Sequence, residues 1–399
     1  MCDTIQFKTR SEIREMDFPK INGNNQHVKK TIVAADIGYS AIKGVSPNKM
    51  FTIPSFVKRA PESLEVFGKA DPNDIVLKDN TTGASYFVGR LANKFINESD
   101  TQSITDTSLY NRYRYNSESF DILVKTALAV GLLRTGTAPT DEIIVQTGLP
   151  SVYKDRDTEK IRAAFAKDYD ISLKVGNSNW YHFVFTIKPE NVYVLEQPQG
   201  TLCSVMFDKS GEFTAQANEI ISSDGVLIWD IGFGTEDIFS IRTRHKDDIP
   251  HKTYSDTAMR AVFDMVASKA IEAGADVKVF EMQKYLEKGA ISYFDPDDDC
   301  VKHFSLDGLI QEANSALCKK SIDRLMAEYN RLMDYKYLIV TGGTGESRFE
   351  QIKEQISAKN PDIIILPGNL NNPELPFAYS NVVGYYMQRH ANVKREQRE

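Results

Sequence analysis

The chain has 399 residues, of which 41% are hydrophobic and 26% charged, and its formal net charge is −7. This length predicts about two domains, and the composition is typical of a soluble globular protein. The negative charge argues against a protein that wraps nucleic acid by its own charge. No apolar run approaches the roughly 20 residues of a membrane helix, and the polar N-terminus lacks the apolar core of a secretion signal. We therefore expect a cytoplasmic protein with no membrane partner.

The cysteines and histidines predict no metal site or catalytic nucleophile. The 4 cysteines include no Cys-x-x-Cys pair, and the 6 histidines are scattered along the chain. We expect ordinary reduced thiols. The acidic run at residues 295–299 lacks the glutamate and glycine of a calcium-binding loop at the required offsets, so we expect a solvated loop there.

The first half of the chain predicts an extension followed by a mixed α/β region. Residues 1–30 combine both charges with an Asn- and Gly-rich stretch at 22–26, which indicates an N-terminal extension. The helix at 116–135 has the clearest apolar periodicity, with Asn116 or Ser117 as its N-cap. Strands are expected at 31–35, 41–45, 50–54, 74–77, 85–89, 142–147, 180–187 and 191–195, and helices at 116–135, 155–166 and 201–207.

The second half repeats this order of elements. Strands are expected at 225–229, 237–242, 337–340 and 362–366, and helices at 255–273, 280–288, 306–330, 346–359 and 372–389. The recurrence of hairpin, helix and strand indicates an internal duplication. The predicted division is an extension at 1–30, domain I at 31–222 with an inserted subdomain at about 55–115, domain II at 223–372, and a closing helix with a polar tail at 373–399 that returns to domain I.

Three glycine-bearing segments follow predicted buried strands, and we expect them to build one nucleotide site. Residues 36–43 and 230–237 share Asp-x-Gly at the start of a hairpin, and residues 341–346 form a Gly-Gly turn that opens a helix. Glycine at a hairpin tip lets backbone N–H groups approach phosphate oxygens. The candidate binding residues are Asp36, Gly38, Tyr39, Ser40, Lys43, Asp230, Gly232, Phe233, Gly234, Thr235, Gly342, Gly343 and Thr344.

The side chains of this set have different expected tasks. Ser40 and Thr235 add hydroxyl hydrogen bonds, and Lys43 reaches phosphate from the second strand of its hairpin. Asp36 and Asp230 are expected to hold a hydrated magnesium ion through water, because Mg²⁺ keeps several waters and takes few carboxylates. The Gly-Gly turn suits the ribose or base, since a helix N-terminus presents free backbone N–H groups.

Together these segments resemble the phosphate-1, phosphate-2 and adenosine motifs of the actin, sugar-kinase and chaperone ATPase superfamily. Within it, the chain is most similar to the ParM (StbA) type of bacterial plasmid-segregation protein. The segments 145–153, 196–200 and 378–384 resemble that type's Leu-Pro strand end, its glutamate-bearing turn and its final helix. The resemblance implies an actin-like α/β fold of the duplicated, ribonuclease-H-like kind, with two domains around a nucleotide cleft.

The chain departs from the family pattern in three places. Tyr39 stands where these proteins carry a small hydroxyl residue, so Ser40 is the expected substitute. Phe233 and Glu236 are bulkier than usual in the second hairpin. The extension at 1–30 is outside the common pattern, and it is open whether it is disordered, docks on the domain or modifies filament contacts.

The activity implied by the resemblance is ATP hydrolysis coupled to the turnover of a homopolymeric filament. ATP, or alternatively GTP, would bind with Mg²⁺, and Glu196 would orient or deprotonate the attacking water, with Gln197 as the adjacent alternative. The filament would move plasmid DNA through a DNA-binding adaptor protein, so that contact with DNA would be indirect.

Other functions stay open from the sequence. A small-molecule kinase of the same superfamily would need a catalytic aspartate near an acceptor pocket, for which Asp237 is the candidate. A cytoskeletal scaffold of the bacterial actin type is a second alternative, although no amphipathic tail supports a membrane tether. A chaperone-type ATPase is disfavoured, because no β-rich substrate domain follows the ATPase region.

Overall fold

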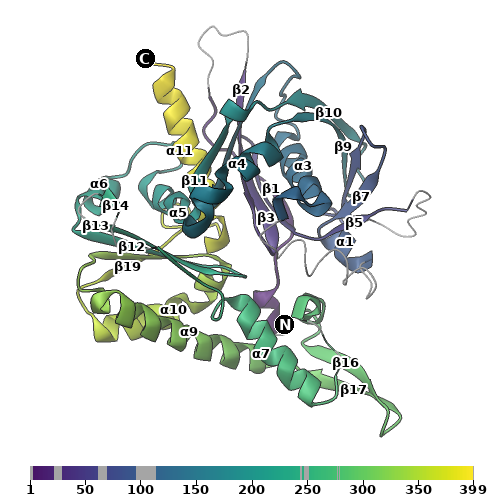
Figure 1. Ribbon diagram of the computed structural model, residues 1–399, viewed down its shortest axis with the longest axis vertical. Coiled ribbons are helices and arrows are strands. Elements are labelled where there is room, and N and C mark those ends of the chain that lie inside the picture. The colour runs from purple at the N-terminus through teal and green to yellow at the C-terminus, as the bar shows by residue number, and fades with distance from the viewer. Residues whose placement is uncertain are drawn as a thin grey trace. The chain divides into compact units, whose positions relative to one another are not determined.

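The computed structural model describes residues 3–21, 29–61, 70–95, 114–242, 245–246, 251–275, 277 and 279–398. Contacts divide the chain into two compact units (Figure 1). The first unit comprises Arg10–Thr214 and Asn381–Glu399, and the second comprises Met1–Thr9 and Ala215–Ser380. The sequence analysis placed the domain boundary at residue 222, whereas the contacts assign residues 215–222 to the second unit.

The first unit is built on a six-stranded sheet in the order β1-β4-β3-β2-β8-β11. Its strands are β1 (Glu12–Glu15), β2 (Lys30–Ile37), β3 (Ala41–Ser46), β4 (Lys49–Pro54), β8 (Glu142–Leu149) and β11 (Val192–Glu196). β2 and β11 both run parallel to β8. The carboxyl ends of these three strands therefore lie at one edge of the sheet, which is where ligands bind in open α/β sheets.

A second sheet of the first unit has five strands in the order β10-β9-β6-β7-β5. They are β5 (Val57–Arg59), β6 (Ile75–Asp79), β7 (Ser85–Val88), β9 (Asp168–Val175) and β10 (Tyr181–Thr186). The region at 55–115, expected as an inserted subdomain, thus shares its sheet with strands from residues 168–186. The helices of this unit are α1 (Arg90–Phe95), α3 (Glu118–Leu132), α4 (Lys154–Phe165), α5 (Gln197–Met206) and α11 (Ser380–Glu396), with 3-10 turns η3 (Arg114–Asn116), η4 (Ser151–Tyr153) and η5 (Pro189–Asn191).

The second unit has a sheet in the order β14-β13-β12-β18-β19, with β15 also paired to β13. Its strands are β12 (Gly225–Ile231), β13 (Glu236–Arg242), β14 (His245–Lys246), β15 (Lys252–Tyr254), β18 (Tyr337–Thr341) and β19 (Ile364–Pro367), and a separate hairpin joins β16 (Ala290–Asp295) to β17 (Cys300–Ser305). α9 and α10 run along the sheet in Figure 1. The helices are α6 (Ala215–Ser222), α7 (Met259–Glu272), α8 (Met282–Tyr285), α9 (Leu309–Glu328) and α10 (Gly343–Lys359), with η1 (Asp3–Phe7), η6 (Val279–Glu281), η7 (Asn330–Leu332) and η8 (Phe377–Tyr379).

The N-terminal extension docks on both units. In the second unit, Thr4 Oγ1 donates to the Leu286 carbonyl over 2.6 Å, and Phe7 joins the hydrophobic core. In the first unit, β1 covers the outer edge of β4, and the ring of Phe18 packs on Tyr386 with centroids 5.5 Å apart. The predicted loop at 22–26 lies outside the described residues.

The expected helix at 116–135 is confirmed as α3, whose Ser117 side chain accepts from Phe120 N. The predicted helix at 280–288 is wrong in length, because only α8 with its preceding 3-10 turn forms there. The predicted final helix starts too early at 372. α11 begins at Ser380, after Pro373 and Pro376, which disfavour a continuous helix. Across the described residues, no helix has both the length and the apolar character needed to span a membrane.

Candidate functional site

One group of predicted site residues lies in the hairpin of β2 and β3 in the first unit. Their register places Asp36 opposite Lys43, so that Gly38, Tyr39 and Ser40 form the turn. The buried Asp36 carboxylate lies 3.4 Å from Lys43 Nζ. Ser55 closes the turn, since its backbone N–H donates to the Ser40 carbonyl and its hydroxyl to the Gly38 carbonyl, both over 2.9 Å. Lys43, expected to reach phosphate, thus neutralises Asp36.

The segment that carries Glu196 and Gln197 lies beside this hairpin. Glu196 ends β11 and Gln197 begins α5, which corrects the expected turn at 196–200 and the helix start at 201. Gln197 Nε2 donates to Asp36 Oδ1 over 3.1 Å. Glu196 is 3% exposed, and its Oε1 is 3.9 Å from Lys154 Nζ. The fold therefore joins the predicted phosphate hairpin to the predicted catalytic segment, although 161 residues separate Asp36 from Gln197.

Another group of predicted site residues lies in the hairpin of β12 and β13 in the second unit, in which Asp230 faces Asp237. The turn closes through a 2.8 Å hydrogen bond from Gly232 N to the Thr235 carbonyl. The ring of Phe233 packs against Phe263 of α7, with centroids 5.8 Å apart. Phe233 therefore anchors the turn to the core, while its carbonyl accepts from Arg260 N over 2.8 Å.

The Gly-Gly turn contacts this second hairpin directly. Thr344 Oγ1 donates to the Gly232 carbonyl over 2.8 Å. Gly342 has φ +85°, and a Cβ there would clash with the Ile231 carbonyl and lie 2.6 Å from Asp230 Oδ1. Only glycine fits this backbone and this close approach. α10 begins at Gly343, three residues earlier than predicted. The free backbone N–H groups of its first turn therefore lie at the hairpin.

Two further carboxylates of β13 are buried behind the turn. Asp237 accepts from Thr235 Oγ1 over 2.9 Å and from Thr253 Oγ1 over 2.6 Å, so the Thr235 hydroxyl already has a protein acceptor. Burial, reinforced by the nearby charges of Asp230 and Glu236, raises the pKa of Asp237 to about 7. Glu236 forms a buried ion pair with Arg348 of α10 over 3.1 Å. The Glu236 side chain, which is larger than expected at this position, is thus accommodated because Arg348 supplies its counter-charge.

The structure brings the predicted residues together as two groups, one in each unit. The first group contains Asp36, Gly38, Tyr39, Ser40, Lys43, Glu196 and Gln197, and the second contains Asp230, Gly232, Phe233, Gly234, Thr235, Gly342, Gly343 and Thr344. Because Asp36 and Asp230 belong to different units, their joint role as magnesium ligands stays a prediction. Within the described parts of the chain, no three His, Cys, Asp or Glu residues gather as a metal-binding group.

Sequence reasoning missed three cations that lie against these groups. Arg114 donates to the Ile37 carbonyl in the first hairpin, Lys154 approaches Glu196, and Arg348 pairs with Glu236. A helix start near Lys154 and a helix over Arg348 were predicted, but no local pattern distinguishes these residues from surface cations. Their partners are distant in sequence, so the pairing depends on the fold.

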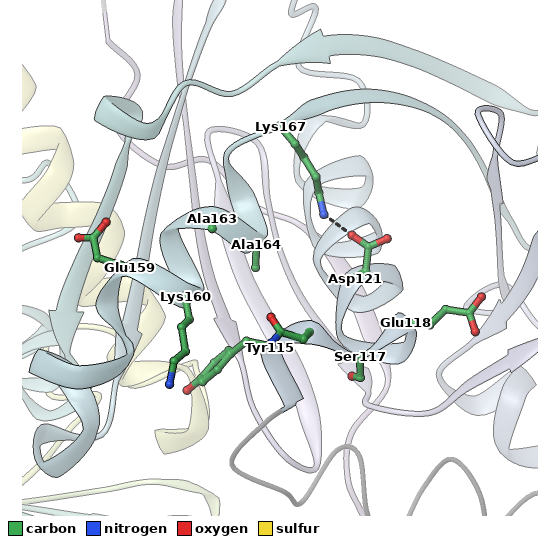
Figure 2. Close-up of a pocket in the computed structure, with 10 residues that line it drawn as sticks. Tyr115, Ser117, Glu118, Asp121, Glu159, Lys160, Ala163, Ala164 and Lys167 are labelled. Atoms are coloured by element: carbon green, nitrogen blue, oxygen red, sulfur yellow. Dashed lines mark hydrogen bonds and ion pairs between the residues drawn. The ribbon is translucent and has the colours of Figure 1, made fainter.

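The first unit also contains an open pocket of about 600 Å³ at the N-terminus of α3 (Figure 2). None of the predicted nucleotide residues lines it. Its charged side chains have partners within the protein: Lys167 pairs with Asp121, as Figure 2 shows, and Lys160 pairs with Asp157. Tyr86 donates to Glu118 over 2.6 Å. This pocket is distinct from the candidate site.

Each unit places an Asp-x-Gly hairpin at the end of a strand that runs parallel to its next neighbour in the sheet. This duplicated arrangement, with a Gly-Gly helix start beside the second hairpin, is the one that the resemblance to the actin-like fold implies. The comparisons with known proteins agree. Residues 34–200 match the family profile of the actin like proteins N terminal domain. No curated protein gives a significant match.

Solved structures match over nearly the whole chain. A non-polymerisable quadruple mutant of pCBH ParM has a TM-score of 0.65 and 18% identity, over 91% of this chain and 100% of its own. A 15-stranded ParM filament from Clostridium botulinum has a TM-score of 0.65 and 18% identity, over 90% and 99%. The ADP complex of Ta0583, an archaeal actin homolog, has a TM-score of 0.61 and 14% identity, over 89% and 97%. The chain therefore has the actin-like fold, and its fold is similar to that of ParM proteins, as predicted.

Proposed function

We propose that this chain is an ATP-hydrolysing, filament-forming protein of the ParM type that moves plasmid DNA through an adaptor protein. The observation that carries the ATPase proposal is the 3.1 Å hydrogen bond from Gln197 to Asp36. It sets the segment of the water-orienting candidate Glu196 against the phosphate-1 hairpin. In-line attack on a γ-phosphoryl group needs mainly positioning and charge neutralisation, and this junction supplies a carboxylate, an amide and a lysine.

The residues fit a nucleotide with magnesium. Asp36 is a buried carboxylate oriented on one side by Lys43 and on the other by Gln197. Carboxylates held in this way suit a metal bound through water. Asp230 would take the corresponding role in the second unit. Bound Mg²⁺ would neutralise phosphate charge, and the backbone N–H groups at Gly234 and Gly343 would orient the phosphates. The N–H groups of Gly38 and Gly232 instead close their own turns on the Ala41 and Thr235 carbonyls.

The filament and its cargo are inferred from similar proteins. One of the similar structures is a ParM filament, and another is a non-polymerisable mutant of a ParM protein. We infer that this chain also assembles with copies of itself, that nucleotide hydrolysis weakens the contact between copies, and that DNA is bound only through an adaptor. The ADP complex of an archaeal actin homolog favours an adenine nucleotide over GTP.

The kinase alternative has less support. Its candidate base, Asp237, accepts hydroxyl hydrogen bonds on both carboxylate oxygens and is 3% exposed. A base that receives a proton from an acceptor hydroxyl must reach that hydroxyl within hydrogen-bond distance. Phosphate release in the absence of any acceptor separates a hydrolase from a kinase.

Glu196→Ala tests the assignment of the water-orienting residue. We expect nucleotide binding to persist and phosphate release to fall by about 100-fold or more, as for the loss of a general base. Filaments of the variant should outlast those of the wild type, because hydrolysis would trigger disassembly. Glu190→Ala, which removes an exposed carboxylate from η5, is the matched control and should behave as wild type. Unchanged phosphate release in Glu196→Ala would exclude the role of Glu196.

Assembly is tested with the unmodified chain. Light scattering and pelleting should rise when Mg-ATP is added and fall as phosphate is released, and negative-stain microscopy should show filaments. A chain that hydrolyses ATP but stays monomeric at all accessible concentrations would contradict the filament proposal and leave the ATPase proposal standing.

A further inference from the structure

Arg114 is a buried cation at the phosphate-1 hairpin with no assigned role. It opens η3, directly before α3, and is 7% exposed. Its Nη2 donates to the Ile37 carbonyl over 2.7 Å. Ile37 lies between Asp36 and Gly38, so this hydrogen bond holds the backbone at the point where the strand enters the turn.

The guanidinium also supports the turn through Tyr39. Its central carbon lies 4.4 Å from the centroid of the Tyr39 ring and 5.2 Å from that of the Phe120 ring. A guanidinium over an aromatic face is a favourable cation–π contact. Tyr39 replaces the small hydroxyl residue expected at this position, and the structure shows that its ring is one of the contacts of Arg114.

Among the described residues, the printed contacts of the Arg114 guanidinium are with a backbone carbonyl and with aromatic side chains, including Tyr115 at 5.5 Å from the ring centroid. None of the ion pairs between described residues includes Arg114, and its buried Nη1 has no hydrogen-bond partner among them. A buried charge without a counter-charge is costly, and an aromatic ring compensates only part of that cost. The hairpin beside it is the predicted phosphate cradle, where an anion would supply the missing negative charge.

We propose that Arg114 sets the turn of the phosphate-1 hairpin and supplies the positive charge by which the site prefers a nucleoside triphosphate to a diphosphate. This inference rests on the proposed nucleotide function. Arg114 acts as a positioning residue through Ile37 and Tyr39. Its charge acts on the terminal phosphate, because electrostatic attraction in a buried site is screened less than in water. Because the γ-phosphate adds negative charge, loss of Arg114 would lower the affinity for the triphosphate more than the affinity for the diphosphate.

Arg114→Met tests the proposal by calorimetric titration of the full chain with Mg-ADP and with the magnesium complex of a non-hydrolysable ATP analogue. We expect affinity for the analogue to fall about tenfold more than affinity for ADP, as for one charged hydrogen bond. Arg114→Lys, which keeps the charge but not the planar fork, should restore part of that preference. Arg134→Met, which removes an exposed arginine from the same unit, is the control. It should keep the wild-type ratio of the affinity for the ATP analogue to the affinity for ADP.

The outcomes separate this inference from the proposed function. If the wild type binds neither nucleotide, both fail. If it binds both and Arg114→Met weakens them equally or not at all, only the role of Arg114 is overturned, since a purely structural residue leaves the ratio unchanged. Should Arg114→Met fail to fold, Tyr39→Leu removes the cation–π contact instead. It must then lower the triphosphate preference in the same direction, and an unchanged ratio would overturn the inference.

Discussion

At the residue scale, the described residues include four buried lysine and arginine side chains, and one of them, Arg389, lies over the Tyr193 ring and pairs with Glu396. Arg348 pairs with Glu236, Lys49 donates to Asn48 Oδ1 over 2.6 Å and to the Leu133 carbonyl, and Arg114 stacks on Tyr39. Buried charges need a partner or a dense set of hydrogen bonds. Two of the four, Arg348 and Arg114, contact the candidate nucleotide hairpins.

Arg348→Met should destabilise the second unit by about 3–5 kcal/mol, because it leaves the Glu236 carboxylate buried without its counter-charge. The free energy of unfolding in urea measures the loss. Lys359→Met is the matched control on α10, where the pair with Asp323 is exposed, and it should cost less than about 1 kcal/mol. Equal effects of the two substitutions would show that the buried pair contributes no more than a surface pair.

Because Lys49 is buried, we expect the free energy of unfolding to depend on pH. Burial lowers its pKa from 10.5 to about 8, although the charge of Glu15 opposes the shift. Between these two values the unfolded chain binds more protons than the folded chain, so the free energy of unfolding should rise with pH, by about 3 kcal/mol in all. The difference between wild type and Lys49→Met, measured in urea from pH 7.5 to 10, should show this rise. Parallel curves for the two proteins would contradict it.

At the element scale, contact between α5 and α11 supports the position of the candidate catalytic segment. A Cβ at Gly384 would clash with the Gly200 carbonyl and lie 2.8 Å from Ser204 N. Thr201 Oγ1 also donates to Asn381 Oδ1 over 2.6 Å. Because α5 begins at Gln197, the spacing of these helices determines where Gln197 meets Asp36.

Gly384→Ala should therefore force the two helices apart. We expect a loss of about 1–3 kcal/mol in stability, typical of overpacking, and a lower rate of phosphate release. Thermal unfolding and a phosphate-release assay measure the two effects. Arg395→Ala, an exposed position of the same helix, should change neither. A fully active Gly384→Ala variant would show that the position of Gln197 does not depend on this contact.

Most long elements were predictable because their side-chain pattern is local. The apolar stripe of α3 and the Ser117 cap are examples. β9, for which no strand was predicted, alternates polar and apolar residues from Asp168 to Val175, a pattern typical of a half-buried strand. The start of α10 at Gly343 was missed, since a glycine pair is a weak helix former.

At the scale of the whole molecule, the N-terminal extension forms part of both units. Residues up to Thr9 belong to the second unit, and the chain enters the first unit at Arg10. Phe7 and Phe18 are the aromatic anchors, one in each unit, and both are buried. Of the alternatives predicted for the extension, its described residues therefore show the docked one.

Phe7→Ala and Phe18→Ala should each lower the free energy of unfolding by about 3 kcal/mol, because each leaves a cavity in a packed core. Chemical denaturation measures both variants. Lys20→Ala removes an exposed side chain of the same extension and should stay within about 0.5 kcal/mol of wild type. Wild-type stability in the two phenylalanine variants would show that the extension docks without contributing to folding.

By itself, the sequence predicted the two hairpins and the Gly-Gly turn, because strand patterns and glycine turns are encoded locally, and the actin-like fold followed from its resemblance to a known family. Only the tertiary structure decided that Gln197 meets Asp36, that Phe233 packs into the core, and that Arg114 and Arg348 are buried at the hairpins. These pairings join residues far apart in the chain. No local pattern specifies such pairs, since a cation that pairs in the interior and one on the surface are the same residue type.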